Sequence, residues 1–278
     1  MAIAEAARPV VDQRPPSPRS RSGWFLPLYT AIVIAYLFIP IIVMALFGFN
    51  DISGRFNFAW QGFTLRWYRE LFQIPELTEA LRNSLVIAVM STTVSTAFGT
   101  LIALALTRYR FRGRGTMNVG IFLPMATPEI VMGASLLGLF VTLQVDRGML
   151  TMIIAHIMFS ISFVVVTVRA RIAGFDLSLE DAAEDLGASP LTTFWTVTFP
   201  LIFPGILAAA LLAFALSIDD FVITLFNAGG TTWFPGWVYG ASRIGVPPQV
   251  NVMGTLIFML GAAYVLFSVI RSRRHADQ

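Results

Sequence analysis

The sequence predicts an all-α integral membrane protein with six transmembrane helices. The chain has 278 residues, of which 56% are hydrophobic and 13% are charged. This composition is far more apolar than that of a soluble globular protein. Six apolar segments reach about 20 residues, the length that an α-helix needs to cross a bilayer. These segments are residues 24–49, 85–106, 119–143, 149–168, 202–226 and 250–270.

The first apolar segment is predicted to be a membrane helix and not a signal peptide. It is longer than a signal sequence's apolar region of about 7 to 15 residues, and it lacks a small-residue cleavage site. Residues 1–23 contain four prolines among arginines and little that could be buried, so we expect a disordered cytoplasmic tail there. The transmembrane domain is predicted over residues 24–271, with a second cytoplasmic tail over residues 272–278.

The arginines predict the orientation of the chain. Every basic residue is an arginine, and arginines are concentrated before the first span, after the second, after the fourth and after the sixth. Basic residues mark cytoplasmic loops, so both termini are expected in the cytoplasm. The strongest clusters are Arg8, Arg14, Arg19 and Arg21, and Arg108, Arg110, Arg112 and Arg114. The basic charge is thus explained by membrane topology, and no basic stripe interleaved with aromatic residues indicates a nucleic-acid site.

The composition excludes several kinds of chemistry. The chain has no cysteine, which excludes disulfides, thiolate metal sites and cysteine nucleophiles. It has no lysine and no Gly-x-x-x-x-Gly-Lys loop, so it cannot bind ATP by that motif. His156 lies in the fourth span, where a hydrogen-bonded packing residue is favoured over a ligand. We therefore predict no catalytic residues, no bound metal and no cofactor, and any ATPase must be another subunit.

A short polar segment between the fourth and fifth spans predicts two cytoplasmic helices within residues 176–199. Ser178 is a good N-cap with Asp181 three residues on, and Gly187 suits the left-handed position that ends a helix. Ser189 with Pro190 indicates a second helix start, and Phe199-Pro200 is expected to end that helix. An ordinary connecting loop is the alternative.

The same segment combines small and acidic residues. Ala182, Ala183 and Gly187 would let a partner surface approach the backbone closely. Glu180 and Glu184 are charges on a short helix, which usually face water. The sequence therefore favours the small residues as the contact surface and a solvated face for the two glutamates.

Three carboxylates lie within the predicted spans. Ionisable residues there cost a few kcal/mol to insert and are functional candidates. Glu129 is about 12 residues into the third span, roughly 18 Å from the cytoplasmic side and near the midplane. Asp219 and Asp220 are about 17 residues into the fifth span, roughly 25 Å from that side and near the external mouth.

No arginine lies inside a span to neutralise these acids. Unpaired acids along a path would attract a cation, and Phe221 and Trp233 could contact an alkylammonium chain. The alternative is structural: a neutral, hydrogen-bonded Glu129 that packs between helices, and aspartates that reach water. Both interpretations stay open at this point.

The cytoplasmic segment resembles the EAA motif of the inner-membrane permeases of binding-protein-dependent ABC importers. That motif has Glu-Ala-Ala, three residues, Gly, nine residues, Ile, one residue and Leu-Pro. Here Asp181-Ala182-Ala183, Gly187, Val197 and Phe199-Pro200 stand at those positions, with three conservative departures. The resemblance implies a type I ABC importer permease fold, in which this segment docks on a cytoplasmic ATPase and Pro200 belongs to the coupling motif.

Further motifs resemble the second-permease branch of the spermidine/putrescine permease family. They are residues 63–68, 83–85, 128–130 and 217–222, and residues 229–251 resemble the family's last external loop. The resemblance implies a polyamine importer in a bacterial inner membrane. It also implies four kinds of partner: a second permease subunit, two ATP-binding cassette ATPase subunits, a periplasmic or lipid-anchored binding protein, and membrane lipid.

Two rivals to a polyamine importer remain. The same coupling motif serves importers of metal ions, thiamine or compatible solutes. An ion-coupled secondary transporter could use the same acids, although it would not need a docking helix and would typically show an internal repeat. A membrane hydrolase is disfavoured because the sequence has none of the usual catalytic motifs.

Overall fold

The computed structural model describes residues 24–54, 56–174, 176 and 178–276, and it is built from helices. The predicted tail over residues 1–23 lies outside this part of the chain. The helices are α1 (Phe25–Phe47), α2 (Arg66–Arg69), α3 (Pro75–Arg108), α4 (Arg114–Ala126), α5 (Glu129–Thr142), α6 (Met149–Ala173), α7 (Ser178–Asp185), α8 (Pro190–Thr193), the π-helix η1 (Phe194–Thr198), α9 (Phe199–Asp219), α10 (Val222–Asn227), α11 (Phe234–Ala241) and α12 (Pro248–Ala276).

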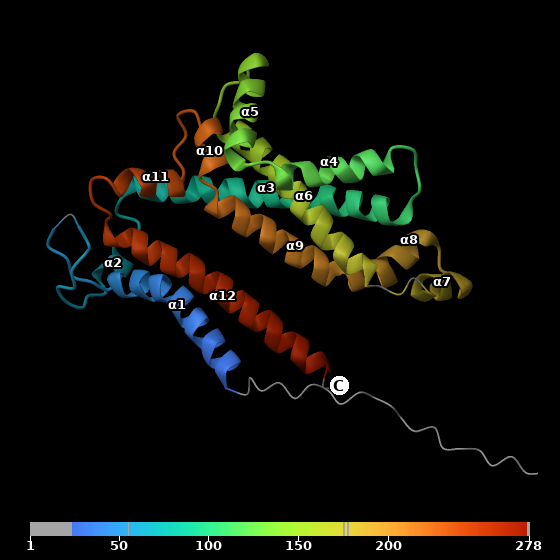
Figure 1. The fold of residues 1–278 in the computed structure, drawn as a ribbon, viewed down its shortest axis with the longest axis horizontal. Coiled ribbons are helices and arrows are strands. Elements are labelled where there is room, and N and C mark those ends of the chain that lie inside the picture. The colour runs from blue at the N-terminus through green and yellow to red at the C-terminus, as the bar shows by residue number, and fades with distance from the viewer. Residues whose placement is uncertain (1–23, 55, 175, 177, 277–278) are drawn as a thin grey trace, which may run out of the picture.

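The centre of the fold is a stack of three long helices, α3, α6 and α9 (Figure 1). Small residues allow these helices to approach closely: a Cβ added at Gly99 of α3 would lie 2.6 Å from Cγ1 of Val164 on α6. A Cβ at Gly205 of α9 would lie 2.5 Å from Cβ of Arg171. Close backbone approach at small residues is how membrane helices associate, because lipid is as apolar as their side chains.

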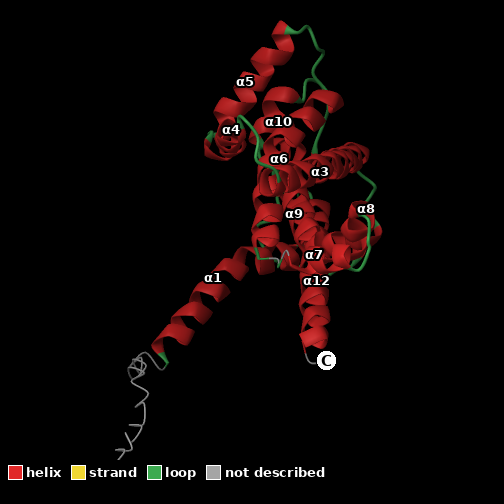
Figure 2. Cartoon of the chain, turned by 90° about the vertical axis from the view of Figure 1, so that its right-hand side faces the viewer, coloured by secondary structure: helices red, strands yellow, loops and turns green. Residues whose placement is uncertain are grey.

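A second unit, the pair α1 and α12, extends away from this stack (Figures 1 and 2). Gly254 of α12 accommodates Met44 of α1, since a Cβ there would lie 2.8 Å from the Met44 sulfur. The rings of Phe38 and Phe258 meet edge to face with centroids 6.4 Å apart. No residue of α1 is fully buried, so its apolar surface is left for lipid or for another subunit.

The length and composition of the helices make the chain a multi-pass membrane protein. In the described part of the chain, four helical stretches are long and apolar enough to cross a membrane, and the bent pair α4–α5 makes five if it is one span. The first four predicted spans fall on α1, α3, α4–α5 and α6, the fifth begins on α9 and the sixth lies in α12. α12 continues to Ala276, over most of the predicted C-terminal tail.

Two spans predicted as continuous helices are interrupted, so those predictions were wrong in detail. The third breaks at Thr127 and Pro128, where the chain is extended and the axes of α4 and α5 differ by 108°. A residue before proline is pushed towards extended backbone, which explains the position of this break. The fifth ends at Asp219, and the chain resumes helical form in α10.

The packing of α3 on α6 gives a test of the core. Gly99→Ala is expected to destabilise the protein by about 1–3 kcal/mol, because the new methyl group would overlap Val164. Gly138→Ala in α5 is the control, since nothing lies within 4 Å of a Cβ there and alanine favours a helix by about 1 kcal/mol. Thermal unfolding of the detergent-purified protein, followed by tryptophan fluorescence, measures both. Equal midpoints for the two variants would contradict the close approach.

Candidate functional site

The three acids predicted in the spans line one cavity. Glu129, Asp219 and Asp220 surround a space of about 320 Å³ together with apolar side chains. The apolar part of the wall is Phe159, Leu212, Ala215, Leu216, Phe221 and Val222. The structure therefore brings together residues that are 90 positions apart in the sequence, in a setting that combines negative charge with an apolar and aromatic surface.

The cavity lies where the two interrupted helices break. Glu129 is the first residue of α5, directly after the extended Pro128. Asp219 ends α9, and Asp220, with extended backbone, leads into α10. The prediction of a continuous helix through Glu129 was wrong, because the span breaks directly before this residue. A carboxylate in the first turn of a helix is stabilised by the free N–H groups there.

Asp220 differs from the other two acids because its carboxylate is buried and fully partnered. Its side chain is 4% exposed, and it accepts hydrogen bonds from the backbone N–H of Thr224 at 2.7 Å and from the Thr224 hydroxyl at 2.6 Å. The N–H of Ile223 adds a longer contact of 3.4 Å. Nε2 of His156 lies 3.5 Å from Oδ2 of Asp220. The expectation that this acid has no basic partner was wrong.

His156 is a packing residue held in a polar network, as the sequence favoured. Its Nδ1 lies 2.6 Å from the Ser217 hydroxyl and its Nε2 lies 2.8 Å from the Thr224 hydroxyl. Ser217 in turn lies 3.1 Å from Ser91. The network joins α3, α6, α9 and α10 in the apolar interior. The sequence did not predict the two hydroxyl partners, because only the fold brings them close to His156.

Glu129 and Asp219 remain available to a ligand. Both residues are exposed, and within the described chain neither side chain makes a hydrogen bond or ion pair. Phe221 lies beside them, and its ring packs against Tyr239 with centroids 5.0 Å apart and against Trp233 at 6.2 Å. Exposure of Glu129 disfavours its interpretation as a neutral packing residue. Phe221 lines the cavity, whereas Trp233 packs against the Phe221 ring and does not line the cavity.

The structure contains the predicted short helix, α7. Gly187 has φ of +90°, a conformation that glycine adopts without strain. The N–H of Gly187 donates to the Glu184 carbonyl at 2.8 Å and the N–H of Ala188 donates to the Ala183 carbonyl at 3.1 Å. These two bonds form a Schellman ending. At the other end, the Asp176 carboxylate accepts the N–H of Ser178 at 3.0 Å, which lowers the pKa of Asp176. Ser178, predicted as the N-cap, is the first residue of α7.

The second predicted helix start is also present. The Ser189 hydroxyl accepts the Thr192 N–H at 3.3 Å, with Pro190 in the first turn of α8. The predicted break at Phe199-Pro200 was wrong: α8 continues through the π-helix into α9, and Pro200 lies in the first turn of α9. Pro200 directly follows the π-helix, where the N–H of Phe199 donates to the Phe194 carbonyl five residues back. This change of hydrogen-bonding register accommodates a residue that has no N–H to donate.

Near Gly187 in the sequence, exposed apolar side chains accompany the exposed acids of α7. Leu186 is 90% exposed, and Leu191 and Trp195 are also largely exposed. No atom lies within 4 Å of the position where a Cβ of Gly187 would stand. Asp181 and Ala182 are exposed and Ala183 is half-buried. Exposed apolar residues grouped around a small residue are typical of an interaction surface.

Glu180 does not share the solvated face predicted for it. Glu184 is exposed, but the Glu180 side chain is only 14% exposed and forms an ion pair with Arg108 at the end of α3. The sequence could not show this pair, because the two residues are separated by 72 positions.

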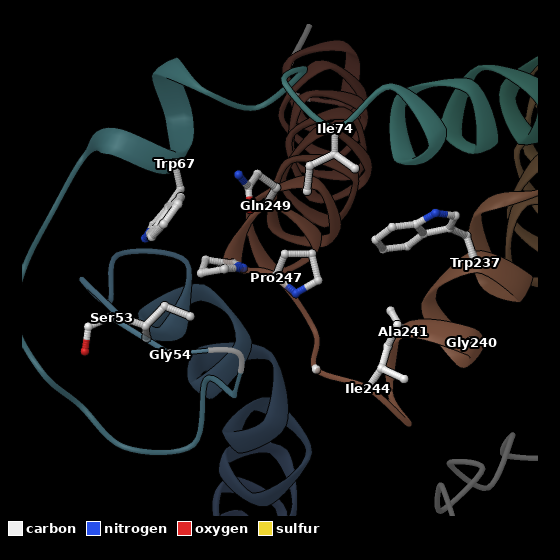
Figure 3. A pocket seen from close by; sticks show the side chains of 13 residues that line it. Ser53, Gly54, Trp67, Ile74, Trp237, Gly240, Ala241, Ile244, Pro247 and Gln249 are labelled. Carbon is white, nitrogen blue, oxygen red and sulfur yellow. The ribbon is translucent and has the colours of Figure 1, made fainter.

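A groove of about 820 Å³ opens at the opposite end of the molecule, between α2, α11 and the start of α12. Trp67, Ile74, Trp237, Pro247 and Gln249 line it (Figure 3). It includes Ile244, Gly245 and Pro248, from the predicted last external loop. That loop therefore forms one side of an open, mainly apolar surface.

Interrupted membrane helices that enclose carboxylates are a feature of membrane-embedded transport proteins. The comparison with protein families agrees with this class. The chain belongs to the family described as the binding-protein-dependent transport system inner membrane component, whose model matches residues 95–274. It is thus a permease subunit and not an enzyme.

Curated relatives cover nearly the whole chain. The spermidine/putrescine transport system permease protein PotC of Escherichia coli K12 is 40% identical over 254 residues, which is 91% of this chain and 94% of PotC. The putrescine transport system permease protein PotI of the same organism is 38% identical over 257 residues, or 90% of each chain.

The fold is also similar to solved structures. A chain of a bacterial ABC transporter involved in the import of the acidic polysaccharide alginate matches with a TM-score of 0.64 at 18% identity, over 90% of this chain and 96% of that chain. A chain of the inward-facing MetNI methionine ABC transporter matches with a TM-score of 0.54 at 17% identity, over 76% of this chain and 98% of that chain. At these identities the likeness concerns the fold.

The neighbouring aspartates provide a test of their different roles. Asp220→Ala is expected to destabilise the protein by about 1–3 kcal/mol, because buried N–H and hydroxyl groups lose their acceptor. Asp219→Ala is the matched control and should change the midpoint of thermal unfolding little, since this side chain is exposed. The opposite order of stabilities would show that the network does not hold α10 in place.

Proposed function

We propose that this chain is the permease subunit of an ATP-driven importer for polyamines such as putrescine and spermidine. The observation that carries the proposal is the cavity in which two exposed carboxylates, Glu129 and Asp219, face apolar and aromatic walls. The names of the two relatives, which cover about nine-tenths of the chain, support the substrate class. Polyamines are alkyl chains with several ammonium groups. The carboxylates suit the ammonium groups, and the apolar and aromatic walls suit the alkyl chain.

The carboxylates would replace part of the hydration that an ammonium group loses on entering the membrane. The face of Phe221 would attract a second ammonium group or cover the methylene chain. Asp220, held by Thr224 and His156, would contribute negative potential and the shape of the wall and would not bind the cation directly. A cavity of about 320 Å³ is at the small end of ligand-sized pockets, as expected for a slender substrate.

We further propose six spans with both termini in the cytoplasm. In this arrangement α4–α5 is one interrupted span and α12 is the sixth. The arginine clusters support this orientation, and Arg108, Arg110, Arg112 and Arg114 then share the cytoplasmic side with α7. The host membrane would be a bacterial inner membrane.

The surface of α7 and α8 would dock on an ATPase. Asp181, Ala182, Ala183 and Gly187 would meet the partner, with Leu186 inserted into an apolar groove. The complete transporter would contain a second permease subunit and two ATPase subunits. At the outer end, the groove between Trp67 and Trp237 would face the substrate-binding protein. From this position the binding protein would release the substrate into the cavity.

Transport would use two states of the assembly. ATP binding would move the ATPases together and displace α7, and this displacement would favour the state in which the cavity is open to the outside. A ligand shifts such an equilibrium only as far as its affinities for the two states differ. The chain itself would therefore convert ATPase movement into a change of access.

Importers of thiamine, a metal ion or a compatible solute are the second candidates, because they share the coupling surface. In the described residues no group of three potential metal-ligating side chains is close enough to hold a metal ion. An ion-coupled secondary transporter would not require α7 or the exposed Leu186 that follows it.

ATP-dependent uptake by the reconstituted complex in vesicles tests the proposal. Uptake of radiolabelled putrescine or spermidine is expected, with competition by unlabelled polyamines and none by choline, thiamine or ferric ion. Omission of the ATPase subunits should abolish it. Failure to take up either polyamine while the ATPase is active would overturn the substrate assignment.

The same vesicles test the cavity. Glu129→Gln and Asp219→Asn remove one negative charge each and are expected to reduce uptake by about fivefold or more, in the usual range of a lost charge-assisted contact. Assembly with the ATPase subunits should be unchanged. Glu184→Gln, which neutralises an exposed acid outside the cavity, is the control, and unchanged kinetics in both cavity variants would remove these residues from the path.

A further inference from the structure

Three residues from three helical elements meet beneath the docking surface. Arg108 is the last residue of α3, Glu180 lies in the first turn of α7, and Thr198 ends the π-helix η1. Nη2 of Arg108 donates both to Oε1 of Glu180 and, at 3.2 Å, to the Thr198 hydroxyl. The Thr198 hydroxyl donates to the same Glu180 oxygen. One carboxylate thus links the docking helix to two membrane-helix elements.

The surroundings of this cluster strengthen it. The side chains of Arg108 and Glu180 are 31% and 14% exposed, and Thr198 is buried. Water and salt therefore screen this pair less than a surface ion pair. Arg108 also stands at the C-terminal end of its helix and Glu180 near the N-terminal end of its own, where each charge is favoured by the helix dipole.

Apart from this cluster, α7 packs mainly on α8 and η1 and not on the long membrane helices. No residue of α7 is fully buried, and Leu179 and Leu186 are largely exposed. By contrast α3, with 34 residues, is packed along α6 and α9 through buried side chains. The cluster is therefore the polar contact through which a displacement of α7 reaches α3 without passing through the loops that join α7 to α6 and α8.

We propose that Arg108 and Glu180 are positioning residues that transmit the movement of α7 to α3, with Thr198 as their shared hydrogen-bonding partner. This inference rests on the proposed docking of α7 on an ATPase. Breaking the pair should leave the ATPase able to bind and turn over while α3 no longer follows α7. The expected defect is thus uncoupling, in which ATP is hydrolysed but the substrate is not transported.

The first experiment compares transport with ATP hydrolysis in the reconstituted complex, both normalised to the amount of assembled complex. Arg108→Gln and Glu180→Gln should each lower the number of substrate molecules taken up per ATP by about fivefold or more, as expected for loss of coupling between two sites. ATP hydrolysis stimulated by the loaded binding protein should persist. Arg108→Lys, which retains the charge, should recover part of the ratio.

Two controls separate the pair from general effects. Glu184→Gln neutralises an exposed acid one turn further along α7 and should keep the wild-type ratio. The double variant Arg108→Gln/Glu180→Gln should be no worse than either single variant, because residues that act through one contact are not additive. A defect in Glu184→Gln, losses that multiply in the double variant, or unchanged ratios in the single variants would overturn the proposal.

A second measurement does not depend on the substrate. Amide hydrogen exchange over residues 178–188 of the assembled complex should be faster in Glu180→Gln than in the wild type and in Glu184→Gln, because α7 loses its link to α3. Equal exchange in all three proteins would contradict the link. Failure of the wild-type complex to take up a polyamine would instead overturn the proposed function, so the two failures are distinguishable.

Discussion

The hydrogen bonds that the Asp220 carboxylate accepts at the start of α10 are the interaction on which the membrane interior of this protein depends. A helix that ends inside a membrane leaves N–H and carbonyl groups without water, and these groups must find partners in the protein. Asp220 supplies acceptors for the Thr224 and Ile223 N–H groups, and Nε2 of His156 lies 3.5 Å from its Oδ2. The fifth span can therefore break there, which opens the cavity and leaves Asp219 exposed at its edge.

The same helical stretch connects the cavity with the surface around Gly187. From Pro190 to Asp219 the chain is helical over 30 residues, a length of roughly 45 Å at helical rise. Its first turn lies beside Gly187 and its last residue lines the cavity. Packing against α3 and α6 makes this stretch part of a rigid stack, and rigid elements with two arrangements are the means by which distant sites are coupled. The Arg108–Glu180 pair joins α7 to the end of α3 at the same end of the stack.

Local features were predictable from the sequence, whereas partnerships across the fold were not. Gly187 and Ser189 were identified because caps depend on neighbouring residues. The break at Pro128 was missed, although the proline is visible, since apolar residues on both sides concealed it within one long run. His156 and Asp220 are 64 positions apart and Arg108 and Glu180 are 72 apart. No periodicity within either segment reports such pairs, so Asp220 looked unpaired and Glu180 looked solvated. The grouping of Glu129 with Asp219 required the third span to bend.

The central claim, that the cavity is on the transport path, can be tested directly because the chain contains no cysteine. A single cysteine in place of Ala215, which lines the cavity, would be exposed to a membrane-impermeant cationic thiol reagent in the reconstituted complex. We predict that it reacts in one nucleotide state, that spermidine protects it, and that the reactive side of the membrane changes when ATP is trapped. A cysteine that never reacts, or that reacts equally with and without spermidine in every state, would contradict the claim.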